Sequence, residues 1–449
     1  MATKDEGQEP GQTGDGPERW RAVLPTQIDL ILDPEAGLTG AAVHPPRGEW
    51  GPDGPEFLYR QGHILVRDED VERVRRIING RPVGEGRLAD ARLDRNLNGL
   101  TLFELAADQP VIEALQIIDR RLGRGVATPD HVFYLCMHSG CPATEPEEVP
   151  EEAKPHPPER DEPPCNGTGT LISIVDSGLA IDPPLTQEWM DGVEGDAEPT
   201  YDAAGKIRSY AGHGTFCAGV ARTVARYADV FVEKAFEKAG AAFENDLVTQ
   251  IGEALDRAPD VISLSFGTNT RGDFASLGFD VLKRRLDELK GVILVCAAGN
   301  DNTRKPFWPA AFPWTVSVGA LTQDWKQRAH FSNYGGWVDV YAPGEGLVNA
   351  FATGDFVCVE SPNEGDPRKF AGMARWSGTS FSTPMVAGLI AARMSATGEN
   401  GRQAAAALLR RAQAQAIPGL GAVLYPDQAC DDDPRSCGCR EQSSDDDTK

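Results

Sequence analysis

The sequence predicts an α/β fold, with a large domain built on a mainly parallel sheet and helices on both faces, preceded by a small α+β domain. Two observations support this prediction. From Gly169 onward, short apolar segments alternate with segments of helical periodicity, as is typical of parallel strands covered by helices. Before that point, a strand, helix and strand pattern occupies a short stretch of chain. A chain of 449 residues is also long for one compact unit.

The strands expected in the large domain are short and almost wholly apolar. They are LISIV at 171–175, ADVFVEKAF at 228–236, VISLSF at 261–266, VILVCAAG at 292–299 and WTVSVGA at 314–320. Two amphipathic segments between them, 246–258 and 275–290, are expected to form helices. This alternation predicts a three-layer domain with the sheet in the middle.

The small domain is predicted from two strand-like segments that flank a helix. FLYRQGHILV at 57–66 and HVFYLC at 131–136 are typical of strands. Pro110 is suited to the start of a helix, whose apolar stripe is Val111, Leu115, Ile118 and Leu122.

Composition divides the chain into five parts. Gly, Pro and acidic residues dominate 1–55, which we expect to be flexible, and 56–141 is the small domain. The Pro- and Glu-rich segment 142–168 is expected to be an extended, accessible linker. The large domain follows at 169–427, and an acidic tail containing cysteines, 428–449, ends the chain.

Charge and hydropathy exclude some classes of partner. The net charge of −24 disfavours nucleic acid and anionic lipid, since both are negatively charged. No secretory start and no long apolar stretch occurs, so we expect no membrane contact and a cytoplasmic location. Nine cysteines, an odd number, fit free thiols better than a disulfide framework, which agrees with a reducing compartment.

Three polar residues stand where a nucleophilic site can form. Asp176 follows the strand 171–175 directly, at the end of a parallel strand where α/β folds build their sites. His213 lies between glycines in GHGTFCAGV, and Ser380 precedes a helix in GTSFSTPMVAG. A serine hydroxyl needs a neighbouring base, and that base needs a third group to fix its tautomer. Asp, His and Ser in this order can supply all three functions.

The chain resembles the subtilisin-like (S8) serine peptidases. The resemblance is carried by five segments in the family's order, across 169 to about 425: IVDSGL, GHGTFCAGV, ISLSFG, AAGN and SGTSFSTPMVAG. It implies hydrolysis of peptide bonds through an acyl-enzyme, with Ser380 as nucleophile, His213 as general base and Asp176 as the residue that orients His213. Asn300 in AAGN would then complete the oxyanion hole.

The resemblance also implies where a substrate lies and which cofactors are needed. The substrate would be a protein or peptide segment in extended form. It would bind along Ser265, Phe266 and Gly267, with Ala297, Ala298 and Gly299 on the facing side of the primary pocket. No cofactor is expected, although the excess of acidic residues allows a weak calcium site. The calcium-binding loop of many secreted relatives is expected to be absent, because residues after His213 pass quickly into a strand.

Cys217 lies four residues after His213, on the same helical face. A metal site or a thiol nucleophile is conceivable there, but a buried small side chain is the favoured interpretation. Some family members carry a free cysteine beneath the histidine, so we expect sensitivity to mercurials.

Residues 56–141 occupy the place of the family's propeptide, which implies an intramolecular inhibitor and a self-processed zymogen. A permanent regulatory domain is the alternative. Two other functions stay open, a catalytically silent binding module and a serine esterase. A damaged site would favour the first and a GxSxG motif the second, and neither is found at Ser380.

Overall fold

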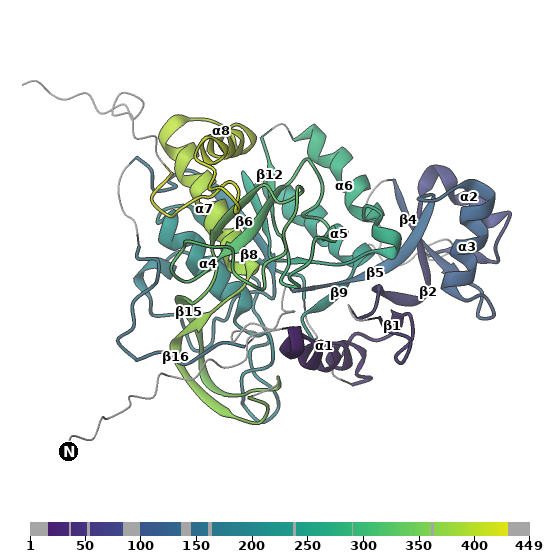
Figure 1. Cartoon of the computed structure of the whole chain (residues 1–449), viewed down its shortest axis with the longest axis horizontal. Helices are drawn as coiled ribbons and strands as arrows, with labels where there is room; N and C mark the ends of the chain where they lie inside the picture. The colour runs from purple at the N-terminus through teal and green to yellow at the C-terminus, as the bar shows by residue number, and fades with distance from the viewer. Residues whose placement is uncertain are drawn as a thin grey trace, which may run out of the picture.

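The computed structural model describes a large and a small domain (Figure 1). The described residues are 17–35, 37–51, 54–83, 99–135, 145–159, 164–236, 239–289, 291–360 and 363–429. The acidic tail from 430 onward, with Cys430, Cys437 and Cys439, lies outside the described residues. So do the first 16 residues and the cysteines at 136 and 141.

The large domain contains a seven-stranded sheet in which every described pair of neighbours is parallel, as the apolar segments predicted. The strand order is β14-β13-β12-β10-β6-β8-β7. Its strands are β6 (Leu171–Asp176), β7 (Glu194–Gly195), β8 (Asp229–Lys234), β10 (Val261–Leu264), β12 (Ile293–Ala297), β13 (Val316–Leu321) and β14 (Val340–Pro343).

Helices cover both faces of this sheet, which makes the predicted three layers. They are α4 (His213–Val224), α5 (Glu244–Ala254), α6 (Leu277–Glu288), α7 (Thr379–Thr397) and α8 (Gly401–Ala414). Short 3-10 turns occur at Glu188–Met190, Leu255–Arg257 and Arg271–Asp273. Helix α7 is buried along most of its length because its sequence is rich in small and apolar residues, and it packs against α4 and the central strands. This packing fixes the two helices that carry His213 and Ser380 relative to each other.

The small domain has an antiparallel sheet covered by one main helix. Its strands are β2 (Phe57–Arg67), β3 (Gly80–Pro82), β4 (Leu100–Leu105) and β5 (Ala127–Leu135), and its helices are α2 (Val71–Arg75) and α3 (Val111–Leu122), with a 3-10 turn at Asp68–Asp70. The apolar stripe of α3 packs on β2 and β5, as its periodicity predicted. Figure 1 shows β5 leaving this domain and running toward the large one.

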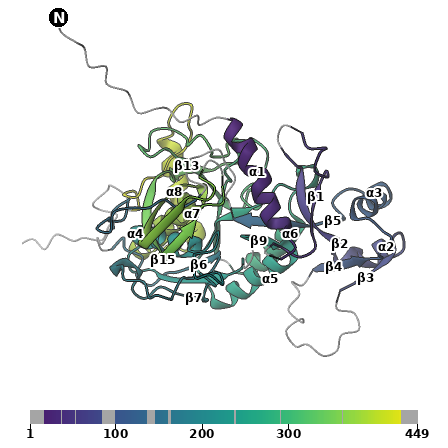
Figure 2. The ribbon, with the colours of Figure 1, turned by 90° about the horizontal axis from the view of Figure 1, so that it is seen from below.

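The N-terminal segment differs from its predicted flexibility. Residues Pro17–Leu32 form α1 and Ala41–His44 form β1, which pairs with β2. Ile28 and Ile31 of α1 are buried. In Figure 2 this helix lies beside β1 and β9 (Ala241–Phe243). Burial of these apolar side chains against both domains offsets the conformational entropy that this Gly- and Pro-rich segment loses when it becomes ordered.

The linker also differs from its prediction, because residues 145–159 are held against a long hairpin of β15 (Leu347–Val357) and β16 (Pro367–Trp376). Glu147 exchanges backbone hydrogen bonds of 2.8 and 2.9 Å with Arg375 on β16. His156 does the same with Val348 on β15, at 2.9 and 3.1 Å. The linker therefore pairs with both edges of the hairpin. The composition of the linker predicted that it would be solvated. The edges of a β-hairpin, however, carry unpaired backbone N–H and C=O groups, which can form hydrogen bonds with an extended segment of almost any sequence.

Cys165 is disulfide-bonded, so the expectation of free thiols was wrong at this position. Cys217, Cys296 and Cys358 are free and buried. A disulfide is typical of an oxidising compartment. The cysteines therefore no longer support the reducing compartment that the expected free thiols had favoured. Within the described residues, no helix combines the length and the apolar character that crossing a membrane requires.

Candidate active site

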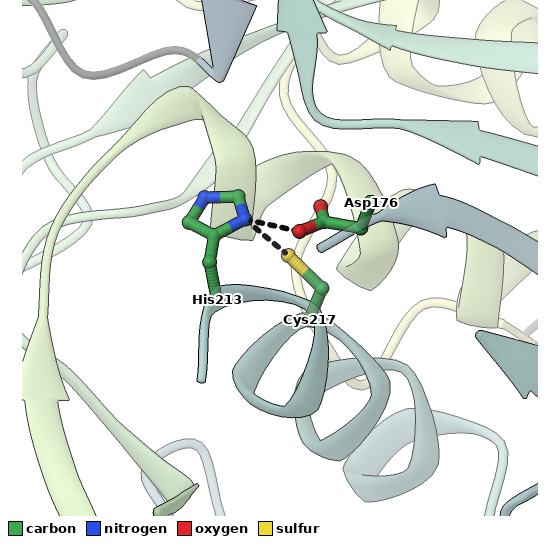
Figure 3. Close-up of side chains that lie close together, drawn as sticks. All are labelled: Asp176, His213 and Cys217. Atoms are coloured by element: carbon green, nitrogen blue, oxygen red, sulfur yellow. Dashed lines mark hydrogen bonds and ion pairs between the residues drawn. The ribbon is translucent and has the colours of Figure 1, made fainter. Parts of the chain in front are cut away.

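Asp176 and His213 form a buried hydrogen-bonded pair (Figure 3). Asp176 is the last residue of β6 and His213 the first of α4, and the distance from Asp176 Oδ1 to His213 Nδ1 is 2.7 Å. The backbone N–H of Ser177 also donates to Asp176 Oδ1, at 2.8 Å. A carboxylate bound at Nδ1 fixes the imidazole tautomer and leaves Nε2 available as a base.

The start of α4 depends on Gly212, which has a φ of 81°. A Cβ at this position would lie 2.5 Å from the ring of Phe351, so both the backbone conformation and the space favour glycine. The His213 ring is then enclosed by aromatic side chains. Its centroid is 5.5 Å from that of Trp376, edge to face, and 5.4 Å from that of Phe381.

Ser380 is the second residue of α7, in the same region as His213. Its hydroxyl donates to the carbonyl of Ser265 at 3.4 Å. Among the described residues, His213 Nε2 has no hydrogen-bond partner, so the Ser380 to His213 bond is not formed in this structure. Catalytic hydrogen bonds without substrate are often long or misaligned and tighten in the complex.

Asn300 is held by Thr379 through two hydrogen bonds, from its backbone N–H and its hydroxyl, both at 2.9 Å to Asn300 Oδ1. The Asn300 Nδ2 group lies near the start of α7. A Cβ built on Gly378 would lie 3.5 Å from this Nδ2 and 3.6 Å from the backbone N of Ser380. Two donors thus converge on one region at the start of α7, where the helix dipole adds positive charge.

Cys217 lies beneath the Asp176–His213 pair, with its Sγ 3.9 Å from His213 Nδ1 (Figure 3). It also contacts the Ser265 hydroxyl at 3.6 Å and donates to the carbonyl of Ser380 at 3.5 Å. Across the described residues, Asp176, His213 and Cys217 are the group whose donor atoms lie close enough for a metal ion. The hydrogen bond between Asp176 and His213 already uses the atoms such an ion would need.

The predicted substrate strand is occupied by the small domain. Phe266 and Gly267 form β11 (Phe266–Gly267), which pairs antiparallel with Leu135 and Tyr134 of β5. On the other side of β5, Tyr134 pairs with Ala241 of β9. The end of β5 is therefore the middle strand of three, bound as an extended substrate would be.

Residues Ala297–Gly299, predicted to lie across the primary pocket from Ser265–Gly267, lie near the end of β5 and Asn300 only in part. Ala297 belongs to an apolar cluster with Tyr134 and Phe307. The Gly299 N–H donates to the Thr379 hydroxyl at 3.1 Å, next to Asn300, whereas the N–H of Ala298 donates to the carbonyl of Val318. Ser265 contacts the nucleophile directly, because its hydroxyl donates to the Ser380 carbonyl at 2.8 Å.

Two residues at the site were missed by sequence reasoning. Thr379 anchors Asn300, and its place directly before Ser380 in SGTS was a signal. Glu198 accepts a hydrogen bond of 2.7 Å from the N–H of Gly212, directly before His213. Burial raises the pKa of Glu198 to about 8, against a lowering by the Ser177 hydroxyl and the Gly212 N–H. Glu198 lies in an acidic loop, so nothing in its local pattern marked it.

Comparison with known proteins agrees with this geometry. The profile of the subtilase family matches residues 167–428, more than half of the chain. Thermitase of Thermoactinomyces vulgaris is 28% identical over 242 residues, which is 50% of this chain and 75% of thermitase. An intracellular serine protease of Paenibacillus polymyxa is 30% identical over 246 residues, covering 50% of this chain but 66% of that relative.

Among solved structures, fervidolysin from Fervidobacterium pennivorans, described as a keratinolytic enzyme related to subtilisin, has a TM-score of 0.54 at 18% identity. The match covers 83% of this chain and 61% of fervidolysin, and at this identity it shows the fold alone. The family match, the fold and the Asp176–His213 pair beside Ser380 agree. The chain belongs to the subtilase family, the subtilisin-like serine-type endopeptidases.

Proposed function

We propose that this protein is a serine endopeptidase made as a zymogen, in which the small domain acts as an intramolecular inhibitor. The observation that supports this proposal best is the position of β5, whose end lies between β9 and β11 beside Ser380. A substrate segment and the end of β5 would compete for the same strand position.

The chemistry follows from the residues at the site. Ser380 Oγ attacks the carbonyl carbon of the substrate and His213 Nε2 takes the hydroxyl proton. Asp176 keeps the proton of His213 on Nδ1 and stabilises the imidazolium. The Asn300 Nδ2 and the Ser380 N–H stabilise the oxyanion. His213 then gives its proton to the leaving amine, and water releases the acyl group by the same route. These protein groups supply every proton transfer of the proposed reaction.

Side-chain contacts reinforce the docking of β5. His131 Nδ1 lies 2.9 Å from Glu244 Oε2, and both side chains are almost completely buried. The Thr268 hydroxyl donates to the carbonyl of Val132 at 2.7 Å. Phe133 packs against Phe266. Charged, polar and apolar contacts thus act together, which suits an inhibitor that must outcompete substrate.

Salt bridges add to this interface away from the cleft. Arg271 Nη2 lies 2.8 Å from Asp119 Oδ2 of α3, and Arg67 of β2 pairs with Asp280 of α6. Such pairs favour correct orientation of the two domains more than they add affinity. The small domain is therefore held both inside the cleft and beside it.

Self-processing tests the proposal directly. The wild-type chain and Ser380→Ala are purified in parallel, and intact mass is followed over time. We expect the wild type to be cut after Leu135 and before Glu145, and Ser380→Ala to stay full length. Activity on an unfolded protein should appear only after the cut. A wild-type chain that stays full length and active would show instead that the small domain is a permanent regulatory one.

The rival functions predict other outcomes. A catalytically silent binding module would not react with a fluorophosphonate at Ser380, whereas an intact site would, and His213→Ala would block the reaction. A serine esterase would cleave small acyl esters but no protein. The cytoplasmic location expected from the sequence stays a prediction, which cell fractionation can test.

A further inference from the structure

A small cavity lies beneath Leu135, the last residue of β5. Its volume is about 20 Å³. The lining includes Leu135, Ser177, Glu198, Tyr210 and Phe236. Ser177 directly follows Asp176 in sequence, and Tyr210 lies three residues before His213. The cavity is therefore next to the catalytic pair, on the side of the cleft that holds the end of β5.

Backbone contacts fix where the side chain at this position points. Leu135 pairs with Phe266 on one side, and its N–H donates to the carbonyl of Gly240 at 2.9 Å on the other. A Cβ built on Gly240 would lie 3.4 Å from Leu135 Cδ1 and 3.1 Å from the ring of Tyr210. Any extended segment bound in the same register places its side chain over the same cavity.

Glu198 gives this cavity its chemical character. Its Oε2 accepts the hydrogen bond from Gly212, while its Oε1 is buried and makes no hydrogen bond of regular geometry with a described residue. The Ser177 hydroxyl also acts on this carboxyl, because it lowers its pKa. The pKa of this carboxyl, raised by burial to about 8, means that it is mostly protonated beside Leu135 at neutral pH. A cation brought into the cavity would take the place of that proton and supply the missing partner.

We infer that Glu198 makes this subsite selective for lysine at the substrate residue that takes the place of Leu135. Beyond the leucine side chain the cavity has room for one compact group. A volume of about 20 Å³ accommodates a group the size of water, as an ammonium is. Arg208 also lines the cavity. Its side chain is exposed, and its Nε donates to the carbonyl of Tyr201 at 2.8 Å.

The inference rests on the proposed function, since it takes β5 as a stand-in for substrate. The processed enzyme is given two fluorogenic peptides that differ only in Lys or Leu at the position of Leu135. We expect kcat/KM to be about tenfold higher for the lysine peptide. Glu198→Gln keeps the acceptor for Gly212 but cannot ionise beside a bound lysine, and should reverse the preference. Glu194→Gln, which removes an exposed carboxylate on β7, is the matched control and should keep it.

Equal lysine-to-leucine ratios in the wild type and Glu198→Gln would overturn the inference. Failure of the wild type to cleave either peptide, or any unfolded protein, would count against the proposed function instead. A second measurement does not depend on catalysis. In the full chain carrying Ser380→Ala, Leu135→Lys should lower the melting temperature less when Glu198 is present than with Glu198→Gln. Equal decreases in melting temperature with Glu198 and with Glu198→Gln would also overturn the inference.

Discussion

Thr379 holds Asn300 by two hydrogen bonds to one oxygen, each 2.9 Å long. The residue directly before Ser380, the proposed nucleophile, therefore orients the side chain that is proposed to stabilise the oxyanion. Because one donor is a backbone N–H in the first turn of α7, the position of Asn300 follows that of Ser380. The hole and the nucleophile are thus built as one unit, which suits a site that must be preorganised.

Asn300→Ala should lower kcat strongly and leave KM almost unchanged, because the lost donor acts on charge that develops in the transition state. Loss of the corresponding donor in subtilisin costs about 10²–10³ in kcat. Thr379→Val removes one of the two anchors and should cost about tenfold. Steady-state kinetics on a peptide substrate measure both. A rise in KM at constant kcat would show that Asn300 binds the ground state instead.

Phe133→Ala should weaken the hold of the small domain. Phe133 is fully buried, and its ring centroid lies 5.4 Å from that of Phe279 in the large domain. Its removal should cost about 3–5 kcal/mol of docking energy. Activity of the purified chain on a fluorogenic peptide should then appear earlier. Val83→Ala, at a side chain that is 39% exposed, is the control and should leave the time course unchanged.

Asp130→Asn should change how stability depends on pH. Burial raises the pKa of Asp130 from 3.8 to about 7, although Arg60, with its Nε 3.0 Å away, lowers it. The neighbouring Asp246 and Glu244 raise it, and the N–H of Asn245 lowers it. A raised pKa means that the folded chain binds the proton more tightly than the unfolded one. This stabilisation is complete below the unfolded pKa and is lost as the pH rises through about 7.

The test compares unfolding of the Ser380→Ala chain with and without Asp130→Asn. Between about pH 5 and pH 8, the stability of the chain with Asp130 should fall relative to the asparagine variant by about 3 kcal/mol. Denaturant melts at several pH values measure this difference. A constant difference between the two chains would mean that the pKa of Asp130 is the same in the folded and unfolded states.

A mercurial should inactivate the processed enzyme through Cys217. The thiol is buried 3.9 Å from His213 Nδ1, so a heavy atom on it would displace the Asp176–His213 pair. Cys217→Ala should keep activity and become resistant. Cys358→Ala is the matched control, because Cys358 is also a free and buried thiol but lies beyond the end of β15. Resistance conferred by the control would place the sensitive thiol elsewhere.

The sequence was sufficient to single out Asp176, His213 and Ser380 as candidates because each lies in a local segment whose residues also build its backbone. Gly212 is needed before His213, and small residues surround Ser380. Hydrogen-bond partners that are distant in sequence from these segments could not be predicted. The carboxyl of Glu198 reaches Gly212 from a loop with no periodic pattern, and it is marked only by its burial in the folded chain.

Local composition predicted the wrong degree of order for segments whose packing partners lie elsewhere in the chain. Residues 145–159 have the composition of a solvated linker, yet their backbone groups pair with both edges of the β15–β16 hairpin. Helix α1 contains Pro25 and follows a Gly-rich segment, and its order comes from burying Ile28 and Ile31. Such contacts depend on tertiary packing, which local composition does not encode.

The pairing of the linker with the hairpin also determines what a cut would separate. Leu135 is held in the cleft, whereas Glu147 and His156 are held by Arg375 and Val348, far along the chain. A break between the two would leave each new end already attached to the large domain by different hydrogen bonds. If the chain is the proposed zymogen, cleavage and departure of the small domain would therefore be separate events, and dissociation after the peptide bond is broken would set the rate of activation.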